Sequence, residues 1–198
     1  MKQLNFITGN MGKLAEIQER VKTLDIKVIQ KDLGYPEIQT ETLEEVAEYG
    51  VNHVQKKFNE PFILEDAGLF IDDLDGFPGV YSKYVFYTIC LKGILKLMEN
   101  MTKRSAVFRS VYAYAEPNSK PTLFVGECKG TIAIKERGAG GFGYDPIFIP
   151  DCESKTFAEM SRGEKNRYSH RGKALDKLFD FLKNDMIQNQ EKPLNPRK

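Results

Sequence analysis

The sequence predicts a mixed α/β fold, and two patterns support that prediction. In the first part of the chain, short apolar runs alternate with stretches of helical periodicity in the order β-α-β-α-β. Farther along, residues 107–115 and 123–134 alternate polar and apolar side chains, as antiparallel strands with one buried face do. A chain of 198 residues with both patterns is expected to form one domain, or two lobes that share a core.

The first half of the chain divides into short, well-marked elements. Residues 4–8 predict a strand, a helix with regularly spaced apolar residues follows, and residues 26–29 predict a second strand. A capping box at Thr42 opens a helix that we expect to reach about Phe58. Gly50 lies inside that helix and weakens it by about 1 kcal/mol relative to Ala, which indicates close packing there.

The second half contains the two long antiparallel strands and ends in a helix. Residues 93–98 predict part of another helix, and residues 147–149 a short last strand. A second capping box begins at Ser161, and the apolar periodicity continues to about residue 182. We therefore assign residues 1–183 to one domain and predict that the polar, proline-containing segment 184–198 is a disordered tail.

Composition and charge exclude several classes of protein. The formal net charge is +1, which argues against a dedicated nucleic-acid binder. Cys90, Cys128 and Cys152 form no C-x-x-C pair and are expected to be reduced thiols. The apolar runs are all shorter than the roughly 18 residues that a membrane helix needs, and the start lacks the pattern of a signal peptide. We expect a cytoplasmic protein with no membrane and no nucleic-acid partner.

The first candidate motif lies where the first strand meets the first helix. Its residues are Thr8-Gly9-Asn10-Met11-Gly12-Lys13. Small residues in such a turn let backbone N–H groups approach a phosphate, the helix N-terminus favours an anion, and Lys13 adds positive charge. The motif is not a Walker A loop, because Leu14 stands where that loop has its metal-binding hydroxyl. An ordinary strand-to-helix turn with Asn10 as N-cap fits the same pattern.

The second candidate is the pair of carboxylates Glu65 and Asp66, which follows the apolar run 62–64. The pattern predicts a strand that ends at this pair, on the edge where α/β sheets bind ligands. A carboxylate there can hold Mg²⁺ or take a proton from water. The alternative is a solvated pair without a function.

The third candidate is the glycine-rich segment Gly140-Gly141-Phe142-Gly143-Tyr144-Asp145-Pro146. Glycine lets a backbone come close to a ligand, and a neighbouring aromatic ring can stack on a nucleobase. The alternative is a tight turn with a buried phenylalanine.

The fourth candidate places Lys165, His170 and Arg171 within seven residues, near the start of a helix. Together these side chains can bind phosphate oxygens and the edge of a purine. The alternative is a solvated basic face.

In this order, the four motifs resemble those of the inosine-triphosphate pyrophosphatase family, whose members remove deaminated purine nucleotides. The family pattern is T/S-x-N-x-x-K, then E/D-D-[ST]-x-L after a strand, then F-G-Y-D-P, and S-H-R before the last helix. This chain has the corresponding segments at residues 8–13, 65–69, 142–146 and 169–171. The resemblance extends from residue 4 to about residue 182, and the four motifs together are specific although each is weak alone.

The resemblance implies an activity and an architecture. The reaction is hydrolysis of ITP, dITP or XTP to the monophosphate and pyrophosphate, with Mg²⁺ as cofactor. The fold is a two-lobed α/β structure with a long curved mixed sheet flanked by helices, a central active-site cleft and a homodimeric assembly. Asp66 corresponds to the general base and a metal ligand, and Glu37 to the second metal ligand.

The resemblance also implies a substrate-binding set. Phe142 corresponds to the ring that stacks on the base, and His170 and Arg171 are expected to donate to the 6-oxo group of the purine. The full set is Thr8, Gly9, Asn10, Met11, Gly12, Lys13, Ala67, Phe142, Gly143, Tyr144, Asp145, Lys165, His170 and Arg171.

The chain departs from the family pattern at two places. Ala67 stands where the family usually has Ser or Thr, so a hydroxyl beside Asp66 is missing. Many members carry a phosphate-binding lysine on the second helix, whereas the nearest position here is Tyr49, with Lys56 and Lys57 two turns farther along. One triphosphate contact is therefore absent or supplied differently.

Two other functions fit part of the same pattern. A Maf-like nucleotide pyrophosphatase shares the type of fold but has a serine- and arginine-rich first loop, in place of the sequence around Lys13. A nucleic-acid-binding module would stack bases on Phe142 and Tyr144, but the charge balance speaks against it.

Overall fold

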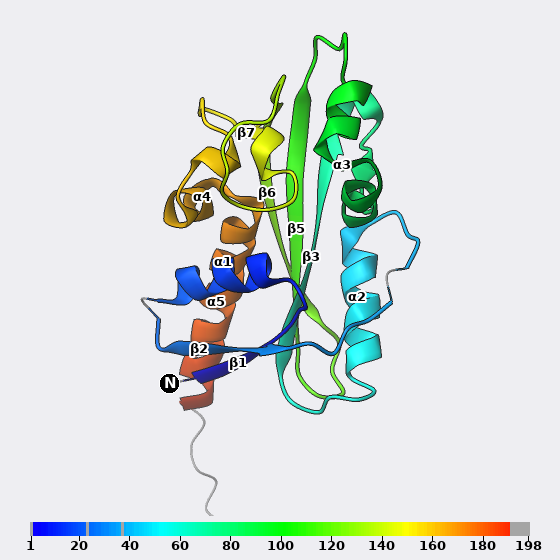
Figure 1. Cartoon of the computed structure of the whole chain (residues 1–198). Helices are drawn as coiled ribbons and strands as arrows, with labels where there is room; N and C mark the ends of the chain where they lie inside the picture. Colours follow the sequence, from blue (N-terminus) through cyan, green and yellow to red (C-terminus); the bar gives the residue numbers. More distant parts are fainter. Residues whose placement is uncertain (1, 23, 37, 191–198) are drawn as a thin grey trace, which may run out of the picture.

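A computed structural model describes residues 2–22, 24–36 and 38–190 of the chain (Figure 1). Within these residues, one mixed sheet has the strand order β2-β1-β3-β5-β6-β7, and β4 pairs with β3. The strands are β1 (Lys2–Ile7), β2 (Ile26–Lys31), β3 (Phe62–Ile71), β4 (Pro78–Gly79), β5 (Ser105–Ala115), β6 (Thr122–Ile132) and β7 (Phe148–Pro150). The helices are α1 (Met11–Val21), α2 (Leu43–Val54), α3 (Ser82–Leu97), α4 (Arg162–Tyr168) and α5 (His170–Gln190). Short 3₁₀ turns are η1 (Asp72–Leu74), η2 (Asp145–Ile147) and η3 (Phe157–Glu159).

The long strands β3, β5 and β6 connect two lobes, as the resemblance implied (Figure 1). In the lower lobe, β1 and β2 extend the sheet by parallel pairing. Side chains alternate along β3, so Ile63 packs toward α1 and α5 while Leu64 packs toward α2 on the other face. In the upper lobe, α3 and β7 enclose a separate apolar core around Phe108 and Phe148. The expected mixed α/β fold is confirmed.

Several boundaries differ from those that the sequence predicted. α2 ends at Val54 and does not reach Phe58. β3 does not end at Glu65 and Asp66 but continues to Ile71, because its pairing with β5 extends well beyond its pairing with β1. α3 begins at Ser82, before the expected residues 93–98. α5 continues to Gln190, into the segment predicted as a disordered tail, because that segment has neither Gly nor Pro before residue 193. Residues 191–198 lie outside the described part.

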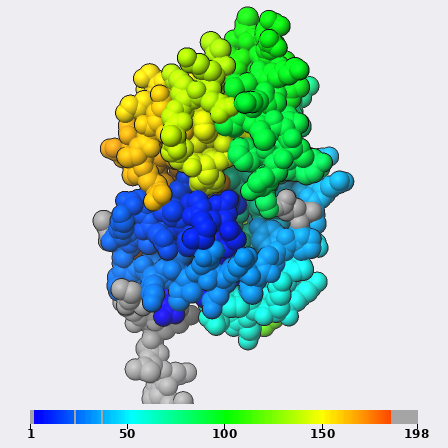
Figure 2. Space-filling model, viewed as in Figure 1, coloured from blue at the N-terminus to red at the C-terminus, as the bar shows by residue number. Residues whose placement is uncertain are grey.

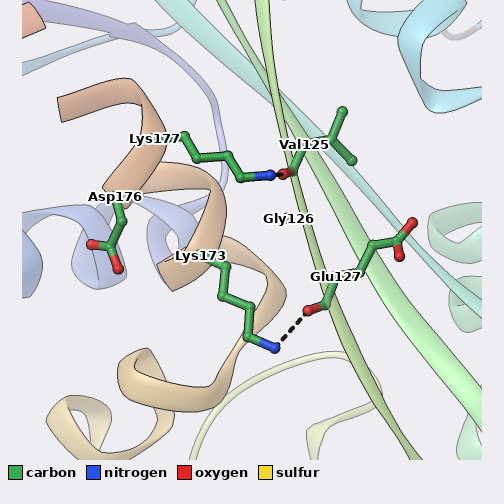
Figure 3. A pocket seen from close by; sticks show the side chains of 6 residues that line it. All are labelled: Val125, Gly126, Glu127, Lys173, Asp176 and Lys177. Atoms are coloured by element: carbon green, nitrogen blue, oxygen red, sulfur yellow. Dashed lines mark hydrogen bonds between the residues drawn. The ribbon is translucent and has the colours of Figure 1, made fainter. Parts of the chain in front are cut away.

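The free edge of β6 is covered by two lysines of α5 (Figure 3). The Nζ atoms of Lys173 and Lys177 donate to the main-chain oxygens of Glu127 and Val125, at 2.9 and 2.7 Å. At Gly126 the helix backbone comes so close that an added Cβ would lie 2.1 Å from the His170 oxygen. The absence of a side chain at Gly126 therefore lets the first turn of α5 rest directly on the sheet.

Candidate active site

The candidate site lies along an open stretch of the β3 edge. β1 pairs with β3 up to Leu64, and β4 pairs with β3 only at Leu69 and Phe70. Between them, among the described residues, no strand borders β3 on this side. The first motif leaves the end of β1 at this point, so the phosphate-loop candidate and the two carboxylates come together although Glu65 and Asp66 are not at a strand end.

The turn of the first motif has the geometry that its sequence predicts. Asn10 is the N-cap of α1, and its side-chain oxygen accepts from the N–H groups of Gly12 and Lys13 at 2.9 and 3.1 Å. The Thr8 hydroxyl accepts from the Asn10 N–H at 3.1 Å. Met11 is 64 % exposed.

Lys13 links this turn to β3. Its Nζ donates to the main-chain oxygen of Glu65 at 2.7 Å and lies 2.7 Å from the Oε2 of the same residue. The ammonium group is therefore held at the open edge of β3, one residue away from Asp66.

Six buried or half-buried charges, beginning with Lys13, form a chain of alternating sign. The Oε1 of Glu65 accepts from Arg171 Nε at 3.0 Å, and Arg171 Nη1 lies 3.4 Å from Glu16 Oε2. The other oxygen of Glu16 accepts from Lys165 Nζ at 2.6 Å. Lys165 also donates to Asp145 Oδ2 at 2.6 Å. Three cations face three carboxylates, and each buried charge has a partner of opposite sign.

The partners determine which of these groups stay ionised. Burial alone would raise the pKa of Glu65, but the charges of Arg171 and Lys13 outweigh it and lower that pKa to about 2. For Asp145 burial prevails over the attraction of Lys165, and its pKa is raised. Glu65 is thus a permanent anion in this site, which keeps Arg171 and Lys13 in place.

The Phe142 ring lies at the far end of the charge chain. Lys165 Nζ and Arg171 Cζ are each 4.9 Å from its centroid. The Phe142 N–H donates to Asp145 Oδ2 at 2.7 Å, which fixes the start of the turn. On α1 of the other lobe, a Cβ added at Gly12 would lie only 2.5 Å from the Phe142 ring. The ring therefore packs against Gly12, the second glycine of the motif, where a larger side chain would clash.

These contacts lie on the boundary where the resemblance places the cleft. Figure 2 shows the blue N-terminal segment meeting the yellow segment near residues 140–150 along this boundary. The depression of about 510 Å³ drawn in Figure 3, between β6 and α5, is a different place and contains none of the candidate residues. The candidate site is therefore the chain of charged side chains from Lys13 to Asp145, and not this depression.

Asp66 has surroundings unlike those of Glu65. It is half-buried, on the same face of β3 as Leu64, and its Oδ2 accepts from the Tyr35 hydroxyl at 2.6 Å. Ala67 beside it is also half-buried and pairs with Ser110 of β5.

Two predicted substrate-binding residues lie away from the open edge. His170 is buried, with its ring stacked on Phe108 at a centroid distance of 4.5 Å. Within the described part of the chain, neither of its ring nitrogens has a hydrogen-bond partner. Burial, together with the charges of Arg171 and Lys165, lowers its pKa well below the ordinary value. Tyr144 lies in the upper core, where its hydroxyl donates to the Ser82 oxygen at 2.8 Å.

The remaining candidates are placed as follows. Gly9 lies against Asp32, and Gly143 has a positive φ of 60° in the turn after Phe142. Glu37, the predicted second metal ligand, lies outside the described residues. Lys57 donates to the main-chain oxygens of Leu33 and Gly34 at 2.9 and 3.3 Å, so it anchors a loop in this structure.

Three residues of the site were missed by the sequence reasoning. Glu16 joins Lys165 and Arg171, the Ser110 hydroxyl donates to Glu65 at 2.6 Å, and Tyr35 holds Asp66. Each depends on contacts between distant segments, and no local pattern marks Ser110 or Tyr35. Only Glu16 had a signal, as an acid one helical turn after Lys13.

The donors available for a metal are oxygens. The described residues contain no group of three or more His, Cys, Asp or Glu that could enclose an ion. Mg²⁺ does not need such a cage, because it is usually held by one or two carboxylates together with substrate phosphates and water. The half-buried carboxylate of Asp66 at the open β3 edge fits that requirement, whereas Glu65 is fully engaged with cations.

Comparison with known proteins assigns the chain to a protein family. Residues 4–181 match the model of the Ham1 family, so the chain belongs to the Ham1 family. A protein of Methanopyrus kandleri named dITP/XTP pyrophosphatase is 49 % identical over 181 residues, with 91 % of this chain and 96 % of the relative covered. A protein of Pyrococcus horikoshii with the same name is 51 % identical over 178 residues, covering 90 % and 95 %.

Solved structures agree with this assignment. A HAM1 protein from Coxiella burnetii superposes with a TM-score of 0.80 at 34 % identity, over 93 % of this chain and 100 % of that one. The Staphylococcus aureus Ham1 protein gives a TM-score of 0.79 at 30 % identity, with the same coverage. The family resemblance read from the four motifs is confirmed.

Proposed function

We propose that this protein is a nucleoside-triphosphate pyrophosphatase that hydrolyses ITP, dITP and XTP to the monophosphate and pyrophosphate. The printed names of its relatives support this activity. The observation that carries the proposal is the position of Lys13: its ammonium group lies on the open edge of β3 at the Glu65 oxygen, next to Asp66. A cation that can bind the phosphates and a carboxylate that can take a proton from water are therefore close together. They lie at the part of the β3 edge that no other strand of the described residues covers.

The chemistry follows from these two groups. Asp66 takes a proton from a water whose oxygen attacks the α-phosphorus. The bond between the α-phosphorus and the oxygen bridging to the β-phosphorus breaks, and the leaving pyrophosphate keeps the electron pair. Lys13 and the positive end of the α1 helix dipole stabilise the negative charge that develops there.

Magnesium is part of the proposal. Asp66 would hold the ion together with Glu37, which lies outside the described residues. When bound, Mg²⁺ supplies charge stabilisation to the phosphate oxygens. Glu65 takes no part in this, because its oxygens serve Lys13, Arg171 and Ser110.

The purine base is assigned to the end of the charge chain at Phe142. Stacking on this ring gives affinity, and cationic donors near it give selectivity for a 6-oxo group. Adenine presents an amine there, which would leave the donors unpaired. Of the donors expected from the sequence, Arg171 lies over the Phe142 ring, whereas His170 is buried and stacks on Phe108 in the upper core. Lys165 is an additional donor at the ring.

We also propose that the enzyme works in the cytoplasm as a homodimer. No helix in the described part of the chain has the length and apolar character that crossing a membrane requires. Exposed aromatic side chains on α3 and just before it, at Phe77, Tyr81, Tyr84 and Tyr87, support an interface with a second copy. Light scattering after gel filtration tests this: the wild type should be dimeric and a Tyr84→Lys/Tyr87→Lys variant monomeric.

The activity is tested by a release assay with ITP, dITP, XTP, GTP and ATP, with Mg²⁺ or with EDTA. We expect pyrophosphate and the monophosphate from ITP, dITP and XTP in the presence of Mg²⁺ only. Release of orthophosphate, or a preference for ATP, would refute the proposal. Preference for another nucleotide would favour the Maf-like alternative, and tight RNA binding without turnover would favour the nucleic-acid-binding module.

A further inference from the structure

The hydroxyl of Tyr35 reaches Asp66 from a different part of the chain. Tyr35 lies between β2 and α2, and its hydroxyl donates to Asp66 Oδ2 at 2.6 Å. Ala67, the neighbour of Asp66, has only a methyl group where the family pattern has the hydroxyl of Ser or Thr. The structure therefore supplies a hydroxyl to this carboxylate, but from a loop across the α2 face of the sheet.

The position of the Tyr35 ring is fixed by α2. A Cβ added at Gly50 would lie 3.0 Å from Tyr35 Cε2, 3.1 Å from its Cζ and 3.0 Å from Leu64 Cδ2. The ring thus occupies the space that the missing side chain of Gly50 leaves. This explains the glycine that the sequence places in the middle of a helix.

The backbone of the loop that carries Tyr35 is also held in place. Lys57, just beyond α2, donates to the main-chain oxygens of Leu33 and Gly34. Gly34 has a φ of 57°, a left-handed conformation that favours glycine. The hydroxyl is therefore presented to Asp66 by a loop fixed at its backbone and by a ring fixed against α2.

We propose that Tyr35 is a positioning residue that orients the Asp66 carboxylate for proton abstraction, and that Gly50 provides the space it needs. This inference rests on the proposed function, because it assigns Tyr35 a role in that reaction. A misplacement of a catalytic group by about 1 Å can cost about 100-fold in rate, so one hydroxyl can matter without touching the substrate.

The first test is Tyr35→Phe, which removes the hydroxyl and keeps the ring. We expect kcat for ITP to fall by about 10- to 100-fold, with the Kd for ITP measured by equilibrium dialysis without Mg²⁺ and the melting temperature unchanged. The matched control is Tyr114→Phe, which removes a hydroxyl that donates to Glu116 Oε1 at 3.1 Å near the end of β5. That control should keep the wild-type kcat.

The second test asks whether Tyr35 acts through Asp66. In an Asp66→Asn background, Tyr35→Phe should cause no further loss of kcat, because the group it orients is gone. Gly50→Ala should lower kcat in the same way as Tyr35→Phe. Its control is Gly163→Ala, where an added Cβ meets no atom of the described residues within 4 Å.

The outcomes separate this inference from the proposed function. If the wild type fails to release pyrophosphate from ITP, the proposed function is wrong. If the wild type is active and Tyr35→Phe keeps its kcat, or changes only the Kd, the inference is overturned. Additive losses in the double variant would also overturn it.

Discussion

Glu65 and Asp66 are adjacent on β3, yet their side chains lie on opposite faces of the sheet and in opposite surroundings. Glu65 is buried among Arg171, Lys13 and Ser110, whereas Asp66 is half-buried and bonded to Tyr35. Strand alternation is the cause, since successive side chains point to opposite faces. One carboxylate thus maintains the architecture of the site, and the other is available for chemistry.

Asp66→Asn should abolish most of the activity and leave the fold intact. Loss of a general base costs about 10²–10⁴-fold, and loss of a metal ligand adds to it. We expect kcat for ITP to fall at least by that factor while the melting temperature changes little. A variant that keeps more than half of the wild-type kcat would remove Asp66 from the mechanism.

Glu65→Gln should mainly lower the free energy of unfolding. It removes the carboxylate that Lys13 and Arg171 share and leaves Arg171 with Glu16 alone. Breaking a buried ion pair in this way typically costs about 3–5 kcal/mol. Urea unfolding measures this cost. Glu19→Gln, which removes a surface ion pair with Lys22, is the control and should cost less than about 1 kcal/mol. Equal costs for the two variants would contradict the assignment of Glu65.

Lys13→Ala should weaken the binding of triphosphates far more than that of the free nucleoside. The reason is that the Lys13 ammonium group lies at the open β3 edge, where we place the phosphates, whereas the base is assigned to the Phe142 ring. Titration calorimetry with ITP and with inosine gives the two ratios. Equal losses of affinity for ITP and inosine would show that Lys13 does not bind the phosphates.

Phe142→Ala should reduce kcat/KM for ITP, XTP and ATP by similar factors. Stacking is worth about 1–3 kcal/mol per base whichever base is stacked, which corresponds to about 5- to 150-fold. Steady-state kinetics with the three nucleotides checks this. A variant that loses activity toward ITP alone would show that the ring distinguishes between bases rather than stacking on any base.

His170→Gln should change the pH dependence of stability. The pKa of His170 in the folded protein lies well below that in the unfolded chain, about 6.5. The unfolded state therefore takes up a proton first as the pH falls, and stability present above pH 6.5 is lost below it. Between pH 6.5 and 5, the wild type should lose up to about 1.4 kcal/mol per pH unit more than the variant. Urea unfolding across this range measures the difference, and identical slopes would contradict it.

The local parts of the fold and site were predictable because their signals are local. Asn10 caps α1 and Thr42 opens α2 with a capping box, as their spacing indicated. α3 was mostly missed because it is interrupted: Cys90 has a φ of 56°, so the helical period is broken. Exposed aromatic residues such as Tyr84 and Tyr87 further obscure its apolar face.

The connections within the site were not predictable from one sequence. Glu16 and Lys165 are 149 residues apart and meet only because α1 packs against α4. The end of β3 was misplaced for a similar reason, since pairing with β5 extends the strand beyond Leu64. Charged residues at such distances show no spacing that reveals their partners.

The two lysines along β6 have a consequence for how copies of this protein can meet. Unpaired carbonyl groups on a strand edge invite pairing with a strand of another molecule. Lys173 and Lys177 occupy the carbonyls of Glu127 and Val125 and place two ammonium groups along that edge. Strand-to-strand aggregation through β6 is thereby discouraged at high protein concentration. The homodimer that we propose would therefore use side chains, as on the aromatic face of α3, rather than the β6 edge.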